Sequence, residues 1–453
     1  MHLPAEILVA IADQIFDPAD GRSWDLHQKD KLNLLQVSRY WNSVLLGVVY
    51  GSLRIDEIHF RPLTELVLVN PRIQNSIRGL STSWGDSEHE GDAVTLTERV
   101  LERVGQLSES VEEKNEWVEA LRRLDQDAWL ALLLGSLPKL TTLSSNWRES
   151  APWMTMMVSR AAYNNSALQQ LTTLEVENAD SKDNFATYLV LPFFHLPSLR
   201  SVSLTSVNDS EYIPRPADHP AMHAAPGTSP VESLTFNEPC NGRYGMNEII
   251  RSCKNLREFV YEHEDQVKWG ELYRVFRPRP FYGPLSAHSH CLEVLHLNNY
   301  AYSNDSDDDE EEDEGGPHPR DRWFGSLAGF SRLWDVHMRV ANLLPLHPLD
   351  SHSGCSLKDS LPPNLRWLCL SDCEEWHPTT VYGELLDLLS HRQTLFPKLE
   401  KVEIISCASE DDTRKADPLF GQIRDACENQ GVQFGVFRGD KSRVWPLSSF
   451  EKS

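Results

Sequence analysis

A short pattern of apolar residues recurs along the chain: one apolar residue, two others, an apolar residue, one other, and a final apolar residue. Alternation of this kind predicts a short β-strand with one buried face. We take Ile77 and Val432 as the starts of a first and a last copy, and Leu140 as the start of a partial copy. The clear copies between them start at Leu171, Leu199, Val231, Leu256, Leu292, Leu333, Leu365 and Leu399.

The spacing of the copies indicates a repeat architecture. From Leu140 onward the starts lie 25 to 41 residues apart, which is the range typical of solenoids and similar arrays. Parallel strands need a crossover between them, and helical spacing predicts crossover helices at 246–253, 382–391 and 418–430. Prolines such as Pro138 and Pro197 stand just before a strand and stop the preceding helix. We therefore expect an α/β fold with a parallel strand array.

A helical stretch precedes this array. Residues 63–69 are expected to form a helix that ends at Asn70-Pro71, and residues 96–107 and 111–134 one or two amphipathic helices. The predicted organisation is an N-terminal helical unit at 1–55, a helical linker with the first repeat at 56–135, the repeat domain at 136–440 and a tail at 441–453.

The first fifty residues hold more apolar side chains than short helices can bury. Leu8, Ile11 and Ile15 share one helical face, and a second such face holds Val37, Trp41, Val44 and Leu45. So small a unit should leave a hydrophobic patch for a partner to cover.

These residues carry a family resemblance. Leu3-Pro4-x-Glu6-Ile7-Leu8, followed by Leu35-x-Val37-Ser38-Arg39-x-Trp41, resembles the F-box pattern over residues 2–50. The resemblance implies a three-helix unit that docks on a Skp-type adaptor. The connector from 16 to 31 is longer than the family pattern, which leaves the register of the middle helix open. The adaptor-binding residues it implies are Leu3, Pro4, Ile7, Leu8, Ile11, Leu35, Val37, Trp41 and Leu45. The plainer alternative is a helical cap on the repeat domain.

The repeats resemble the strand segments of leucine-rich repeats, with irregular step lengths. Together the two resemblances imply an F-box protein of the fungal type with an irregular leucine-rich-repeat-like solenoid. Such a protein is expected to be the substrate-recognition subunit of an SCF-type cullin–RING ubiquitin ligase. A non-ligase scaffold is the alternative, and no residues support an enzyme.

The residues between the apolar positions of each copy should face the open side of the strand array. The early copies place small polar residues there, whereas the later ones place an aromatic residue, histidines and an arginine. Trp and Arg are frequent interface hot spots. The predicted substrate-binding residues are His296, His337, Arg339 and Trp367. The alternative is that these are ordinary solvated residues of a repeat surface.

The charge restricts the classes of partner. The net charge is −24, and the run from Asp305 to Glu314 supplies nine of the negative charges. An acidic chain is repelled by phosphate backbones and anionic membranes, so basic protein partners are favoured. Residues 303–320 are expected to be a disordered acidic loop. No secretory signal or membrane-spanning run is visible, which suggests a cytoplasmic or nuclear protein with reduced cysteines.

Motifs of catalysis and metal binding are missing from the sequence. It has no phosphate-binding loop, nucleophile elbow or zinc-protease motif. Cys369, Cys373 and His377 are close in sequence, but a second ligand pair at zinc spacing is absent. We therefore expect no cofactor, no metal and no catalytic residues.

Overall fold

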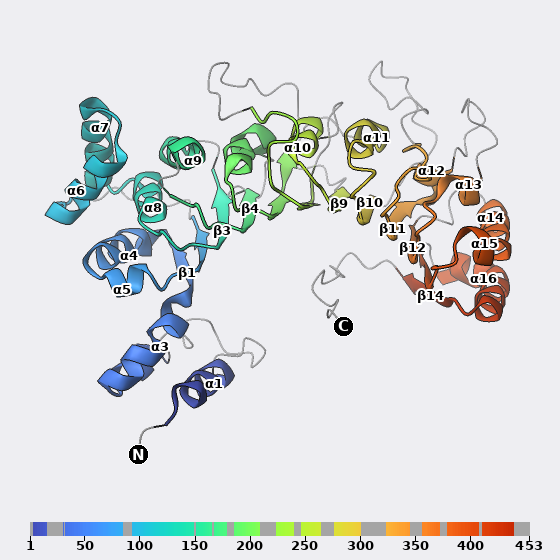
Figure 1. The fold of residues 1–453 in the computed structure, drawn as a ribbon, viewed down its shortest axis with the longest axis horizontal. Coiled ribbons are helices and arrows are strands. Elements are labelled where there is room, and N and C mark those ends of the chain that lie inside the picture. Colours follow the sequence, from blue (N-terminus) through green and yellow to red (C-terminus); the bar gives the residue numbers. More distant parts are fainter. Residues whose placement is uncertain are drawn as a thin grey trace. The chain divides into compact units, whose positions relative to one another are not determined.

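The computed structural model describes residues 3–15, 30, 32–84, 93–148, 151–164, 167–178, 185–208, 223–239, 246–263, 276–299, 323–344, 356–371, 378–406 and 410–438 (Figure 1). These divide into two compact units. The N-terminal unit holds most residues up to Val202, and the C-terminal unit most residues from Ser203 onward. The acidic loop at 303–320, the tail at 441–453, most of the connector at 16–31, Cys373 and His377 lie outside the described residues.

The N-terminal unit begins with helices and continues with the first strands. It contains α1 (Ala5–Ile15), a helical turn at 32–36, α3 (Arg39–Gly51), β1 (Ser52–Asp56), α4 (Glu57–Val69), α5 (Pro71–Gln74), β2 (Gly79–Ser83), α6 (Glu98–Leu107), α7 (Val111–Arg122), α8 (Gln126–Gly135), β3 (Thr142–Trp147), α9 (Pro152–Asn164) and β4 (Thr173–Asn178). The 3-10 helix η2 (Thr187–His195) and strand β6 (Ser201–Thr205) lie at the division between the units.

The C-terminal unit alternates strands with short helices. It contains β5 (Phe185–Ala186), β7 (Val207–Asn208), β8 (Ser233–Asn237), α10 (Asn247–Ser252), β9 (Glu258–His263), α11 (Arg279–Ser286), β10 (Val294–Asn299), β11 (Asp335–Arg339), α12 (Val340–Leu343), α13 (Leu357–Ser360), β12 (Trp367–Ser371), α14 (Pro378–Ser390), α15 (Arg392–Leu395), β13 (Lys401–Ser406), α16 (Glu410–Gln430) and β14 (Gln433–Arg438). Figure 1 shows α14, α15 and α16 beside β12–β14.

The predicted strand array is confirmed. Twelve strands form one sheet in chain order, β1-β2-β3-β4-β6-β8-β9-β10-β11-β12-β13-β14, and β5 pairs with β7 in a second sheet. Each copy of the apolar pattern contains one strand of the large sheet, starting one or two residues after the first apolar residue. Strand β1 has no counterpart in that pattern. It contains only two apolar residues, Leu53 and Ile55, which alternate with Ser52, Arg54 and Asp56.

Parallel pairing in strict register builds the core of each unit. In the N-terminal unit Leu80 pairs with Leu143 and Leu143 with Leu174. In the C-terminal unit one row runs from Leu295 through Val336, Leu368 and Val402 to Phe434. Leu80 is 2% exposed, and the other row members from Leu143 to Val402 are fully buried. Stacked rows of this kind remove a continuous apolar stripe from water.

One backbone arrangement recurs at the start of the strands. The carbonyl oxygen of Trp334 accepts from the N–H groups of Arg366 (2.8 Å) and Trp367 (2.9 Å) in the next repeat. The carbonyl of Arg78 does the same for Thr141 (2.7 Å) and Thr142 (3.0 Å). A carbonyl has two lone pairs, so it can hold two consecutive amides and fix where the following strand begins.

The predicted helices are present with altered ends. Helix α4 starts six residues before the expected position and passes through Pro62, and it ends at Asn70 as predicted. The stretch 111–134 forms two helices, because Leu124 takes a positive φ of 61° and Asp125 caps α8 by accepting from the N–H of Ala128. The three crossover helices predicted from spacing correspond to α10, α14 and α16.

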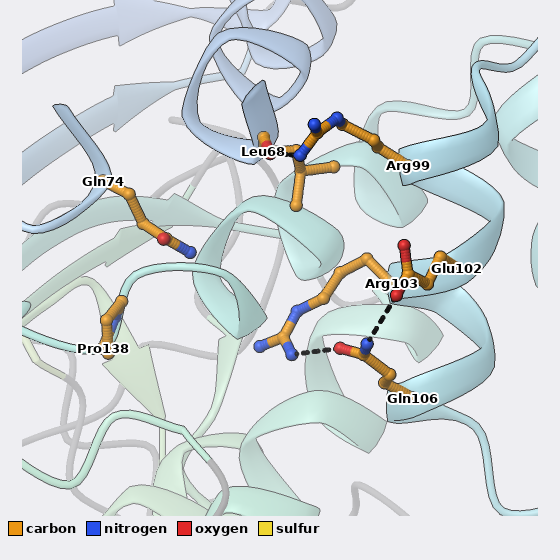
Figure 2. Close-up of a pocket in the computed structure, with 7 residues that line it drawn as sticks. All are labelled: Leu68, Gln74, Arg99, Glu102, Arg103, Gln106 and Pro138. Carbon is orange, nitrogen blue, oxygen red and sulfur yellow. Dashed lines mark hydrogen bonds between the residues drawn. The ribbon is translucent and has the colours of Figure 1, made fainter. Parts of the chain in front are cut away.

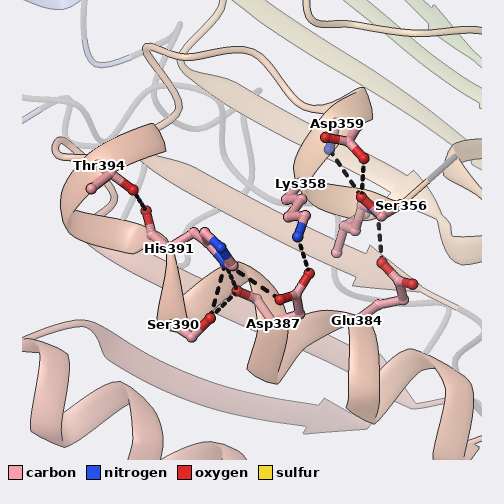
Figure 3. A network of polar contacts seen from close by, with 9 residues as sticks. Ser356, Lys358, Asp359, Glu384, Asp387, Ser390, His391 and Thr394 are labelled. Carbon is pink, nitrogen blue, oxygen red and sulfur yellow. Dashed lines mark hydrogen bonds and ion pairs between the residues drawn. The ribbon is translucent and has the colours of Figure 1, made fainter.

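A polar network joins two helices of the C-terminal unit (Figure 3). The Lys358 ammonium on α13 lies 2.8 Å from the Asp387 carboxylate on α14, and His391 lies 3.3 Å from the same carboxylate. The N–H of Leu357 donates to Glu384 at 2.7 Å. The hydrogen bond from Lys358 lowers the pKa of Asp387. These contacts hold α13 against α14, and none of them involves a strand residue.

A buried carboxyl joins α8 to α9. Asp127 is 5% exposed and accepts from the N–H groups of Trp153 (2.6 Å) and Met154 (2.9 Å) at the start of α9. The ring of Trp153 stacks on that of Trp117, with centroids 5.3 Å apart. Burial raises the pKa of Asp127 from 3.8 to about 7, although the two backbone hydrogen bonds act in the opposite direction.

Replacing Asp127 by Asn should change how stability depends on pH. Between pH 3.8 and about 7 the folded carboxyl keeps a proton that the unfolded chain has lost, so the wild type loses stability as pH rises through this window. The amide that replaces the carboxyl does not titrate. The unfolding free energy of Asp127→Asn, measured by urea denaturation, should therefore rise relative to wild type by roughly 1 kcal/mol between pH 6 and pH 8.5. A difference that stays constant with pH would contradict the raised pKa.

Candidate protein-binding surfaces

The N-terminal helices enclose a small core of their own. Leu8 and Ala12 on α1 pack with Leu45 and Val49 on α3, and all four are at most 1% exposed. Half-buried residues surround them, among them Leu35 and Trp41. Of the implied adaptor-binding residues, Leu8 and Leu45 thus stabilise the helices from inside.

The same helices leave several large apolar side chains in water. Leu3 is 44% exposed, Ile7 47%, Leu32 42% and Val37 59%. Pro4 is also exposed, and Ile11 is half-buried. We call Leu3, Pro4, Ile7, Leu32 and Val37 the N-terminal apolar surface.

Two hydrogen bonds fix the geometry of this surface. The Tyr40 hydroxyl donates to the Leu3 carbonyl at 2.9 Å, which holds the Leu-Pro turn beside the start of α3. Ser38 caps α3, because its hydroxyl accepts from the N–H of Trp41 at 3.2 Å. The cap sets the start of α3 at Arg39, so Val37 lies in the bend just before this helix.

The second candidate surface lies on the strands. We define the open face as the sheet face that carries the residues between the apolar rows. Along this face of the C-terminal unit, register places His296 beside His337, His337 beside Cys369, and Cys369 beside Glu403. The neighbouring row holds Asp335, Trp367 and Lys401.

Polar contacts connect neighbouring strands across the open face. Asn298 Nδ2 lies 3.1 Å from His337 Nδ1, and His296 Nε2 lies 3.2 Å from Asp335 Oδ1. The rings of His296 and His337 meet edge to face with centroids 5.4 Å apart. The structure therefore brings these two predicted substrate-binding histidines together.

A second cluster lies two strands further along. The Trp367 indole N–H donates to Glu403 Oε2 at 2.7 Å, and Lys401 Nζ lies 2.6 Å from Glu403 Oε1. The same ammonium lies 4.2 Å from the centroid of the Trp367 ring. Lys401 and Glu403 were missed in the sequence, yet the rule that gave Trp367, applied to the copy at Leu399, yields both.

The alternative that the predicted substrate-binding residues are ordinary solvated residues does not hold for His337, and several other open-face residues are buried as well. Asn298 is 1% exposed, Asp335 3%, His337 5% and Glu403 0%. Large side chains on adjacent parallel strands stand only about 4.8 Å apart, so they cover one another. Arg339 and Trp367 remain partly exposed. In the N-terminal unit the open-face residues Ser81, Ser144 and Thr173 are also partly exposed, and they are small.

Burial sets the ionisation of this face. Desolvation, helped by the nearby His296, holds the pKa of His337 well below its ordinary value, so His337 is neutral at pH 7. Desolvation and the nearby carboxylates of Glu403 and Asp335 hold the pKa of the Cys369 thiol well above its ordinary value. A protonated thiol is a weak nucleophile and a weak metal ligand.

A surface pocket of about 360 Å³ lies in the N-terminal unit (Figure 2). Its lining residues include Gln74, Arg99, Arg103 and Gln106. Arg103 donates to the carbonyl of Gly135 and to Gln106 Oε1 at 3.0 Å, and Gln74 donates to the carbonyl of Ser136 at 2.8 Å. The donors of Arg103 and Gln74 thus satisfy the carbonyls of Gly135 and Ser136 at the end of α8.

Two features are absent from the part of the chain that the structure describes. No three or more His, Cys, Asp and Glu side chains are grouped there in a way that could hold a metal ion. No helix in the same residues has the length and apolar character needed to cross a membrane.

Comparison with known proteins identifies the repeat domain. No sequence among curated proteins matches the chain. The family described as leucine-rich repeat domain matches residues 92–425, which runs from α6 into α16 and leaves the N-terminal helices outside the match. With the parallel strands and stacked apolar rows described above, this match shows that the chain belongs to the leucine-rich repeat domain family.

Proposed function

We propose that the protein is a substrate-recognition subunit of an SCF-type cullin–RING ubiquitin ligase. The N-terminal apolar surface docks on a Skp-type adaptor, and the open face of the repeats binds the target protein. The chain supplies no catalysis, and chemistry belongs to the partner enzymes of the ligase. Leucine-rich repeat domains generally bind proteins. A role in protein–protein interaction is therefore supported by the family alone, whereas the ligase role is the proposal.

The exposed apolar side chains of the N-terminal helices are the observation that supports the adaptor. Nine large hydrophobic side chains are exposed in the described residues, and four of them, Leu3, Ile7, Leu32 and Val37, fall within the first 37 residues. Their helices have a filled core, so this exposure does not result from loose packing. Several exposed apolar side chains on one small helical unit are typical of a protein interface.

The open face supports a second, separate contact with a target. Its polar groups are carried on paired strands, which fixes their spacing. Binding both adaptor and target would raise the effective concentration of target lysines near the ubiquitin carrier. Rate enhancement by proximity requires no catalytic residue in this chain.

The adaptor contact is tested by removing apolar area from the surface. The double variant Ile7→Ser, Val37→Ser should fold like wild type, since both side chains are about half exposed. It should bind a purified Skp-type adaptor at least about ten-fold more weakly, because two apolar contacts are lost from the interface. Calorimetric titration with the full chain measures the affinity.

A matched control replaces two other exposed apolar residues, Ile58 (58% exposed) and Leu395 (42% exposed), by Ser. This control should bind the adaptor like wild type. Equal affinity of all three proteins, or no adaptor binding by wild type, would exclude the N-terminal apolar surface as the docking site.

Ligase and scaffold differ in what assembles with the adaptor. If the chain is a ligase receptor, the purified complex of chain and adaptor should capture a cullin in a pull-down. A complex that binds adaptor and leaves cullin in solution would favour the scaffold. The Ile7→Ser, Val37→Ser variant serves as the negative control in both assays.

A further inference from the structure

The Lys401 ammonium occupies a site made of an aromatic ring and a carboxylate. It lies 4.2 Å from the centre of the Trp367 ring and 2.6 Å from the Glu403 carboxylate. We propose that Trp367 and Glu403 form a cradle for a lysine or arginine side chain of the bound target, and that Lys401 fills this cradle in the unbound chain. This inference rests on the proposed use of the open face for target binding.

The cradle has the chemistry that recognises an organic cation. The face of an indole ring attracts ammonium and guanidinium groups. The Glu403 carboxylate is fully buried, and the Trp367 N–H holds it in place at 2.7 Å. A buried carboxylate is costly unless a cation accompanies it, so this site needs a positive charge, whether from the chain or from a partner.

Lys401 is placed to exchange with another cation while its backbone stays in the sheet. Its side chain is 33% exposed, whereas that of Glu403 is 1% exposed. The lysine stem is flexible, and its backbone position on β13 is fixed by strand pairing with Trp367 and Gln433. An incoming cation would therefore exchange with the Lys401 ammonium while the carboxylate and the ring stay in place.

The surroundings favour a basic, extended segment of the target. On the open face of β9 to β13 the acidic residues Glu258, Glu262, Asp335 and Glu403 outnumber the cations Arg339 and Lys401. The whole chain carries a charge of −24, which repels acidic partners.

Chemical rescue tests the cradle directly. Lys401→Ala should lower the thermal unfolding midpoint of the full chain, because the Glu403 carboxylate loses its cation. Adding n-butylammonium chloride should restore a large part of that loss, whereas equal NaCl should not. Wild type should respond alike to the two salts. The double variant Lys401→Ala, Glu403→Gln should lose the specific response. If Lys401→Ala responds to n-butylammonium no more than wild type does, the cradle is excluded.

Peptide binding tests the class of target, and its comparison of wild type with Glu403→Gln does not depend on the Lys401→Ala variant. We would use two fluorescein-labelled octapeptides, one alternating Ala with Lys and one alternating Ala with Glu, and measure anisotropy with the full chain. The Lys peptide should bind at least about ten-fold more tightly. Glu403→Gln should weaken binding of the Lys peptide several-fold. Lys401→Ala should strengthen that binding, because it removes the competing ammonium.

Charge-matched controls separate the cradle from bulk electrostatics. Glu428→Gln on α16 removes the same charge at an exposed position, and Lys398→Ala removes the same charge outside the open face. Both should leave Lys-peptide affinity nearly unchanged. Equal effects of Glu403→Gln and Glu428→Gln, or equal binding of the two peptides, would overturn the inference. Neither assay contains an adaptor. A negative result would therefore exclude the cradle and leave the proposed adaptor docking untouched.

Discussion

In-register parallel pairing of short strands is the constraint on which the rest of this structure depends. A shift of one residue in any strand would move its apolar side chains to the open face and its polar ones into the core. The carbonyl of Trp334, which holds the amides of Arg366 and Trp367, shows how the backbone prevents such a shift. With register fixed, rows such as Val336, Leu368 and Val402 stack on one side of the sheet. The other side, the open face, carries the polar and aromatic residues.

The open face follows from that pairing. Trp367 and Lys401 are far apart in sequence but directly paired, and Glu403 reaches the same indole two residues later. A repeat protein can thus assemble a site by changing one or two polar residues per repeat while the apolar rows stay as they are. The bulky residues here also explain why several residues of the face, such as His337 and Glu403, are buried: side chains on adjacent strands shield their neighbours from water.

The N-terminal helices differ from the repeats, because so small a unit cannot bury all of its apolar side chains. Leu8 and Leu45 fill the space between α1 and α3, and Ile7 and Val37, their close neighbours in sequence, remain in water. Filling the core in this way keeps the exposed side chains on an ordered scaffold. The inner apolar residues stabilise the unit, and the outer ones are the basis of the proposed adaptor contact.

The sequence by itself determined the parallel array and the position of eleven of the twelve strands of the large sheet, because each of these eleven buries its apolar residues in the same local pattern. It also placed Trp367, His296 and His337 on the open face, since alternation along a strand is a local property. It did not reveal β1, whose burial depends on pairing with β2, nor which N-terminal apolar residues are inside. Only the tertiary structure decided that His337 and Glu403 are buried and that Lys401 lies on Trp367, because burial and pairing depend on neighbours about thirty or more residues away in the chain.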